Sequence, residues 1–207
     1  MKEYHKIQTV FKRDMKSKTK NIIDGEWTLP EFEYLANNIW VFTEKVDGTN
    51  IRIMYKDGDI TFGGKTDNAQ IPSQLVTRLN EMFLPLKDKF SEVFGCDACL
   101  YGEGYGAKIQ KGGELYRPNQ DFVLFDVRIG EWWLERHNVE DIANKLAIGV
   151  VPIIGEGTLN DAVSLVKSGI KSQWGDFKAE GIVARPKVEL KTRNESRIIT
   201  KIKTKDF

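Results

Sequence analysis

The chain has 207 residues and a net charge of +1, and 41% of its residues are hydrophobic. This length suits one large domain or two very small ones, and the apolar fraction is sufficient for a buried core. No stretch reaches the roughly 18 to 20 apolar residues of a membrane-spanning helix, and residues 1–20 lack the apolar core of a signal peptide. These features argue against membrane and secreted proteins, and we expect a soluble, cytoplasmic one.

The first part of the chain predicts three strands, then a helix, then two buried strands. Residues 39–62 alternate apolar and polar side chains around two Asp-Gly dipeptides, which predicts three strands separated by turns. Residues 72–94 place apolar side chains at helical spacing, and Pro85 is expected to kink or divide this helix. The apolar runs 99–103 and 122–127 predict buried strands.

The second part of the chain predicts two helices and then two strands. Asn138 is a suitable N-cap for a helix that ends at residue 146. A second helix is expected over 160–167, with Gly169 as its stop. Strands rich in β-branched residues are expected at 181–185 and 198–203. Strands dominate without regular βαβ crossovers, so we predict an α+β fold built on antiparallel sheets.

Positive charge is concentrated at the two ends of the chain. Residues 1–20 carry a net charge of +5 and residues 185–205 carry +6, which leaves −10 on the rest. If both ends fold onto one face, they form a basic patch suited to a phosphate backbone. The alternative is a solvated charged surface, and the motifs described below favour the patch for the C-terminal run.

The two cysteines, Cys96 and Cys99, have the spacing Cys-x-x-Cys. A zinc site needs four ligands, and His5 and His137 are poorly spaced to complete one. A redox pair requires a thioredoxin-like strand and helix, which the surrounding sequence lacks. We interpret the pair as buried or half-buried residues that lead into a strand.

The most informative segment runs from Glu44 to Asn50 and reads Glu-Lys-Val-Asp-Gly-Thr-Asn. Its lysine, Lys45, precedes the Asp-Gly pair by two residues. A lysine amine can attack the α-phosphorus of a nucleotide and hold the nucleotide covalently, but only in its neutral form. A lysine with the usual pKa of about 10.4 is protonated at neutral pH. A partly buried site or nearby cations would favour the neutral form. Taken alone, the segment also fits a surface lysine beside an ordinary turn.

Further motifs follow this segment in a fixed order along the chain. They are Tyr101-Gly102-Glu103, the strand 122–127, Glu180-Gly181-Ile182-Val183 and Lys201-Ile202-Lys203. The series resembles the nucleotidyltransferase motifs of ATP-dependent polynucleotide ligases. It is most similar to the RNA ligase family that includes the second RNA ligase of T-even phages and the trypanosome RNA-editing ligases. The resemblance implies an adenylyltransferase fold, in which antiparallel sheets flank a nucleotide cleft.

The resemblance also implies how the domain is organised. Residues 1–207 are expected to form a single nucleotidyltransferase domain. The C-terminal OB-fold or helical module that relatives usually carry is not expected in this chain.

The resemblance assigns four residues to catalysis. Lys45 occupies the position of the AMP acceptor, and Lys201 and Lys203 are expected to face the α-phosphate from one side of a strand. A basic edge strand is the alternative for these two lysines. Glu180 matches the carboxylate that binds a divalent ion in the family.

Four residues are expected to hold the nucleotide. The resemblance implies that the backbone of Glu44 meets the adenine edge and that Glu103 accepts hydrogen bonds from ribose hydroxyls. Phe125 and Val183 are expected to stack on the two faces of the adenine. Alternation along the strand instead places Phe125 with the core residues, so both interpretations of Phe125 stay open.

Three residues are candidates for contacts with phosphate or nucleic acid. Asn50 is expected to contact phosphate or the acceptor strand, and asparagine at this position favours an RNA ligase over a DNA ligase. Arg52 fits a phosphate contact and an exposed strand arginine about equally. Lys65 stands where the family carries an arginine, so it keeps the charge but loses the bidentate fork, and its role is open.

We therefore predict an ATP-dependent RNA ligase that acts through a lysyl-AMP intermediate. The expected cofactors are ATP with Mg²⁺ or Mn²⁺. The expected partner is RNA with 5′-phosphate and 3′-hydroxyl ends, nicked duplexes included, and the enzyme is expected to be a monomer. A viral origin is compatible with the resemblance to phage enzymes. The alternatives are a minimal DNA ligase or nick-sealing ligase of mixed specificity and, ranked lowest, a non-catalytic nucleic-acid-binding domain.

Overall fold

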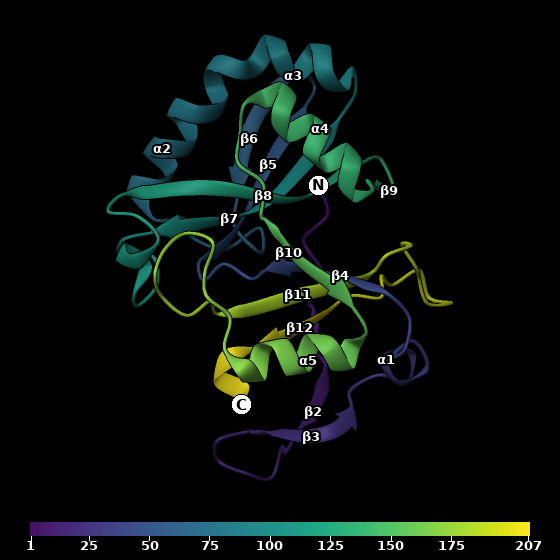
Figure 1. Ribbon diagram of the computed structural model, residues 1–207. Coiled ribbons are helices and arrows are strands. Elements are labelled where there is room, and N and C mark those ends of the chain that lie inside the picture. The colour runs from purple at the N-terminus through teal and green to yellow at the C-terminus, as the bar shows by residue number, and fades with distance from the viewer. The chain divides into compact units, whose positions relative to one another are not determined.

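The chain folds into two compact units in the computed structural model, which describes residues 1–207. The first unit contains Met1–His5 and Asp47–Val151, and the second contains Lys6–Val46 and Pro152–Phe207. Each unit has its own five-stranded sheet and its own hydrophobic core (Figure 1). No helix has both the length and the apolar character needed to cross a membrane.

The second unit is built on a sheet with the strand order β1-β12-β11-β4-β10. Its strands are β1 (Gln8–Thr9), β4 (Trp40–Glu44), β10 (Ile153–Gly157), β11 (Gly181–Pro186) and β12 (Thr200–Lys203). The pairing of β1 with β12 is parallel, and the other pairings are antiparallel. Helix α5 (Leu159–Ser168) packs against β10, β11 and β12 and covers the core face of the sheet.

Smaller elements complete the second unit. They are the β2–β3 hairpin (Phe11–Arg13 and Ile22–Trp27), α1 (Pro30–Tyr34) and the C-terminal 3-10 turn η3 (Thr204–Asp206). The hairpin joins the same core through Phe11 and Trp27, whose ring centroids lie 5.1 Å apart.

The first unit is built on an antiparallel sheet with the strand order β6-β5-β7-β8-β9. Its strands are β5 (Thr49–Lys56), β6 (Asp59–Gly63), β7 (Ala98–Gly106), β8 (Gln120–Ile129) and β9 (Trp132–Trp133). Its helices are α2 (Ser73–Phe83), η1 (Leu84–Leu86), α3 (Lys87–Phe94), η2 (Gly113–Leu115) and α4 (Arg136–Leu146). Helices α2 and α4 both contact β8, and their apolar faces form the core of this unit.

Most of the predicted elements are confirmed, and so is the α+β class with antiparallel sheets. The segment 39–62 contains three strands, and Pro85 lies in the short η1 turn that divides α2 from α3. Helix α5 begins with a capping box between Thr158 and Asp161 and ends at Ser168, with Gly169 as its C-cap, so each end lies within one residue of the prediction.

Two expectations about local structure were wrong. Helix α4 begins at Arg136 rather than after Asn138, because the Arg136 side chain donates to Glu140 and to the Val151 carbonyl and so orders an earlier turn. The turn expected at Asp47-Gly48 is absent, because residues 45–48 form an irregular connection between β4 and β5, which belong to different sheets. The alternative of a lysine beside an ordinary hairpin turn is therefore excluded.

Only one cysteine of the Cys-x-x-Cys pair is buried, whereas both were expected to be buried or half-buried. Cys99 lies buried in β7, where burial raises the pKa of its thiol, but Cys96 is exposed. The two tryptophans also differ. Trp132 is exposed, whereas Trp133 packs against Tyr4 and Tyr101.

Candidate active site

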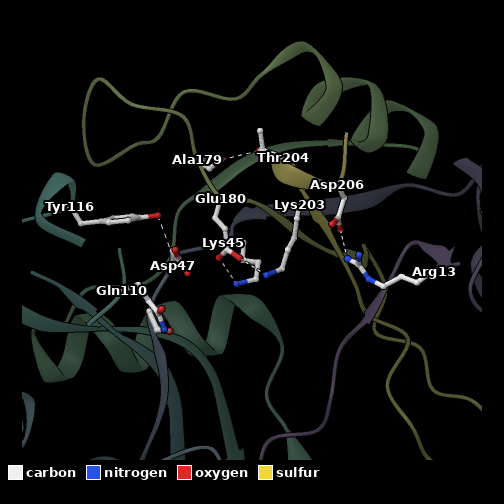
Figure 2. A network of polar contacts seen from close by, with 11 residues as sticks. Arg13, Lys45, Asp47, Gln110, Tyr116, Ala179, Glu180, Lys203, Thr204 and Asp206 are labelled. Atoms are coloured by element: carbon white, nitrogen blue, oxygen red, sulfur yellow. Dashed lines mark hydrogen bonds and ion pairs between the residues drawn. The ribbon is translucent and has the colours of Figure 1, made fainter. Parts of the chain in front are cut away.

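A cluster of two lysines and one glutamate lies in the second unit (Figure 2). The Lys45 Nζ atom is 2.5 Å from one carboxylate oxygen of Glu180, and the Lys203 Nζ atom is 2.6 Å from the other. The three side chains are 20%, 12% and 19% exposed in the order Lys45, Glu180 and Lys203, so each can still be reached from solvent. These residues come from three separate motifs, and the structure brings them together.

The backbone of three adjacent strands fixes the positions of this cluster. The amide of Lys45, which follows β4, donates to the carbonyl oxygen of Gly181 at 2.9 Å. On the other side, the amide of Thr204 donates to the carbonyl oxygen of Glu180 at 2.8 Å. Strand β11 lies between β4 and β12 in the sheet, so the residue that precedes β11 is held between the ends of both neighbours.

The sheet face opposite the core carries Val183, Lys201 and Lys203. Val183 on β11 pairs in register with Lys201 on β12, and both are half-buried. Their neighbours Ile182 and Ile202 are buried in the core. Because side chains alternate between the two faces of a strand, Val183, Lys201 and Lys203 share the face turned away from the core. The prediction that both lysines point to one side of a strand is confirmed.

Glu44 lies at the end of β4 and is only 1% exposed. Its carboxylate accepts a hydrogen bond from the Ser172 hydroxyl at 2.6 Å and one from the Gln173 amide at 2.7 Å. Its own amide donates to the Pro152 carbonyl at 3.1 Å. Glu44 therefore anchors the loop that leads to Glu180. Burial raises the pKa of the Glu44 carboxyl, and the hydrogen bonds from Ser172 and Gln173 oppose this effect.

The raised pKa of Glu44 predicts a pH-dependent contribution to stability. Its folded-state pKa lies above its ordinary value of 4.5, so folding favours the protonated form. The stability that Glu44 contributes is then fully present below that value and is lost as pH rises through the folded-state pKa. Urea unfolding at several pH values is expected to show the wild type losing free energy of unfolding relative to Glu44→Gln as pH rises above 4.5. A difference that stays constant or grows with pH would contradict this prediction.

The first unit brings Asn50 and Glu103 together as direct neighbours on β5 and β7. The Oδ1 atom of Asn50 is buried and accepts no hydrogen bond within the protein. Gly48 allows the strands to approach at this point, because a Cβ atom there would lie 2.2 Å from the Gly104 carbonyl oxygen and 2.8 Å from Glu103 Cγ. Buried acceptors are normally satisfied, so the orphan Oδ1 atom is a position where a ligand hydroxyl or amino group would gain a hydrogen bond.

Phe125 occupies a β-bulge in β8. Tyr101 pairs with Asp126 and Gly102 pairs with Leu124, so Phe125 is the extra residue between them. The bulge interrupts the alternation that would place Phe125 in the core, and its side chain is half-buried against Tyr4, with ring centroids 5.0 Å apart. Phe125 is therefore half-buried and not fully inside the core, as the alternation along the strand would require.

Arg52 is fully buried, so the alternative of an exposed strand arginine was wrong. Its guanidinium donates to the Gly64 carbonyl at 2.8 Å, to the Met1 carbonyl at 3.2 Å and to the Asp67 carboxylate at 2.7 Å. Gly64 and Asp67 flank Lys65, which is exposed in the loop after β6. Arg52 thus holds the loop that presents Lys65, because its donors are occupied by protein acceptors.

Sequence reasoning missed two residues that hold the Asp47-Gly48 segment. The Tyr116 hydroxyl accepts a hydrogen bond from the Asp47 amide at 3.2 Å, and the Gln110 side-chain amide donates to the Gly48 carbonyl at 3.0 Å (Figure 2). Both residues belong to the irregular segment between β7 and β8, and no motif marks this segment in the sequence. Only the fold reveals their contacts.

Comparison with known proteins identifies relatives of this chain. The sequence model of the family described as RNA ligase matches residues 38–203. A variant of the Naegleria gruberi RNA ligase solved with ATP and Mn has a similar fold, with a TM-score of 0.70 and 18% sequence identity. The similarity covers 98% of this chain and 56% of that chain.

A second variant of the same Naegleria gruberi enzyme, solved with AMP and Mn, has a TM-score of 0.66 and 19% identity and covers 84% of this chain and 52% of its own. This chain thus spans about half the length of the solved structures that it matches. No curated protein matches the sequence. The structural similarity confirms the predicted adenylyltransferase fold.

Proposed function

Because this chain belongs to the RNA ligase family, we propose that it is an ATP-dependent RNA ligase. It would join 5′-phosphate and 3′-hydroxyl ends of RNA through a lysyl-AMP intermediate. The relatives with a similar fold were solved with ATP or AMP and Mn, which supports ATP and a divalent ion as the cofactors. We further propose that residues 1–207 act as a single nucleotidyltransferase domain.

One observation carries this proposal, namely the cluster of Lys45, Glu180 and Lys203. Lys45 and Glu180 are separated by 135 positions along the chain, yet their side chains are in contact. An ordinary surface ion pair has one lysine on its carboxylate, whereas Glu180 contacts two. A nucleophilic amine, in contrast, requires nearby charges that control its protonation and that stabilise a reacting phosphate.

We assign Glu180 to a divalent ion, which would replace the ammonium groups of Lys45 and Lys203 now paired with its carboxylate. Carboxylate oxygens are the ligands that Mg²⁺ and Mn²⁺ prefer, and Mg²⁺ is commonly held by one or two carboxylates together with substrate phosphates. Glu180 supplies one such carboxylate beside Lys45. When bound, the ion would neutralise negative charge on the phosphates of ATP.

The chain's own residues account for the first step of the reaction. The ion pair with Glu180 is made by the ammonium form of Lys45, so the amine must leave this pair and lose a proton to solvent before it attacks. Its Nζ atom then forms a bond to the α-phosphorus, the bond from that phosphorus to the bridging oxygen breaks, and pyrophosphate leaves. Lys201 and Lys203 lie on one sheet face and would stabilise the charge on the phosphate oxygens.

The remaining steps transfer AMP to RNA and seal the strand. A 5′-phosphate oxygen would attack the phosphorus of lysyl-AMP and release Lys45, and the 3′-hydroxyl would then attack the activated 5′-phosphorus and release AMP. We assign Glu103 to the ribose hydroxyls, and the orphan Oδ1 atom of Asn50 supports a ligand contact beside it. Phe125 and Val183 are assigned to the adenine faces and the Glu44 backbone to the adenine edge.

We assign Lys65 to phosphate, and we propose that Arg52 acts on nucleic acid only through the loop that presents Lys65. This assignment keeps the positive charge of Lys65 in the proposed site. It gives Arg52 a positioning role in place of a direct phosphate contact.

Two measurements on the wild-type chain test this function. With ATP and Mg²⁺, intact-protein mass spectrometry is expected to show the added mass of one AMP. Nicked duplexes with a 5′-phosphate, and with RNA or DNA on each side of the nick, are then compared with single-stranded RNA. Sealing is expected to require ribonucleotides on the 3′-hydroxyl side.

The alternatives predict different results in the same measurements. Equal sealing of all-DNA nicks would reassign the chain to a DNA ligase or a ligase of mixed specificity. No AMP adduct under any divalent ion, with the chain folded and binding RNA, would indicate a non-catalytic nucleic-acid-binding domain.

A further inference from the structure

A basic groove of about 740 Å³ lies in the second unit, beside the β1–β12 strand pair. We use the name "basic groove" for the cavity lined by six cationic residues, Lys6, Lys12, Arg13, Lys201, Lys203 and Lys205, together with Asp206 and neutral residues. Lys203 belongs both to this groove and to the cluster with Glu180. The groove therefore extends from the cluster that contains Lys45 to the N-terminal strands of the same unit.

The pairing of the two chain ends creates this groove. Gln8 and Thr9 of β1 lie parallel to Thr200 and Lys201 of β12. The Thr200 hydroxyl donates to the Gln8 carbonyl at 3.1 Å, which fixes this register. Three basic residues from each of the two basic segments of the sequence thus line one cavity.

The acidic groups in and around the groove do not balance its positive charge. Asp206 is paired with Arg13 and Glu180 with Lys203, each at 2.6 Å, and these two carboxylates face six cationic residues. Lys12 is 3.7 Å from Glu26, and because both side chains are more than half exposed this pair contributes little. Lys6 and Lys205 are exposed. A concave surface with an excess of one sign of charge attracts ligands of the opposite sign.

The neutral residues of the groove indicate which anionic ligand it suits. Hydroxyl and amide side chains dominate among them, and no aromatic side chain lines the cavity. Such groups bond to phosphate and sugar oxygens, whereas base recognition in single strands uses aromatic stacking platforms. A chain of phosphodiesters fits a lining that is rich in cations, hydroxyls and amides and has no aromatic side chain.

We propose that the basic groove binds the phosphate backbone of an RNA strand without regard to its sequence and leads that strand toward Lys45. This inference rests on the proposed ligase function. It adds Lys6, Lys12 and Lys205 to the RNA-binding residues, none of which belongs to the motifs. Lys203 at the end of the groove would be the point where the strand meets the adenylylated lysine.

The test compares two triple variants of the full chain. In the groove variant, Lys6, Lys12 and Lys205 are replaced by glutamine. In the control variant, Lys187→Gln, Lys191→Gln and Arg193→Gln remove the same charge from exposed positions of the same unit outside the groove. Fluorescence anisotropy measures binding of a labelled 5′-phosphorylated single-stranded RNA over a range of salt concentrations, without ATP or Mg²⁺.

The groove variant is expected to lose about tenfold or more of its affinity at 0.1 M salt, and its salt slope is expected to fall by about 2, since each lost contact to a single strand removes about 0.7. The control variant is expected to lose less than about threefold. Equal losses in both variants, or an unchanged slope in the groove variant, would overturn the proposal. An increased KM for ATP without weaker RNA binding would assign the groove to the polyphosphate of ATP and would also overturn it.

Failure of the proposed function would be visible separately. Because this binding assay requires no turnover, a wild type that binds RNA through the groove but never acquires AMP would refute the ligase and leave the groove assignment intact. Thermal unfolding of both triple variants verifies that they are folded.

Discussion

Lys45→Arg is expected to reduce covalent AMP attachment by about 10⁴-fold or more, as for loss of other catalytic nucleophiles. Arginine keeps the positive charge and forms strong pairs with carboxylates, so the contact with Glu180 is retained. Its guanidinium stays protonated at every accessible pH and cannot attack phosphorus. The free energy of unfolding is therefore expected to change by less than about 1 kcal/mol. Mass spectrometry after incubation with ATP and Mg²⁺ measures the first effect, and urea unfolding measures the second.

Lys187→Arg is the matched control for this substitution. Lys187 also pairs with a glutamate of the same unit, Glu156, at 2.8 Å, but this pair is exposed and lies outside the cluster. The control is expected to retain full AMP attachment. If Lys45→Arg still accepts AMP, another residue is the nucleophile. If it unfolds instead, the role of Lys45 in the ion pair is structural.

The resemblance of short motifs to the ligase family singled out the three members of the second-unit cluster. Lys45, Glu180 and Lys203 each stand at a strand end within a recognisable segment, and strand pairing brings these ends together. The alternation of β12 also predicted correctly that Lys201 and Lys203 share a face. Local pattern was sufficient where the backbone is regular.

The remaining features depend on contacts between distant segments, which local pattern does not encode. The bulge at Phe125 interrupts the alternation of β8, and only the pairing with β7 reveals it. The burial of Arg52 depends on acceptors from the N-terminus and from the loop after β6. Tyr116 and Gln110 hold the Asp47-Gly48 segment from a stretch that has no periodicity.

Gly181→Ala is expected to destabilise the protein by about 3 kcal/mol or more, because the new methyl group would collide with backbone. Gly181 has a φ of +151°, and a Cβ atom there would lie 2.0 Å from the Ile202 carbonyl oxygen and 2.8 Å from Lys203 Cα. Strands β11 and β12 pair at this point, so neither can move without breaking the sheet. Thermal unfolding is expected to show a midpoint lowered by about 10 °C for a chain of this size.

The same substitution should also disturb the chemistry, because Gly181 follows Glu180, accepts the hydrogen bond from the Lys45 amide and pairs in register with Lys203. Gly169→Ala is the matched control, since Gly169 has a φ of +87° but no atom within 4 Å of the added Cβ. Gly169→Ala is expected to lower the free energy of unfolding by about 1 kcal/mol, through backbone strain alone, and to leave AMP attachment unchanged. Equal destabilisation by the two substitutions would mean that positive φ, and not the close approach of β12, explains the glycine at 181. A stable Gly181→Ala protein with full AMP attachment would show that the β11–β12 pairing does not set the positions of Glu180 and Lys203.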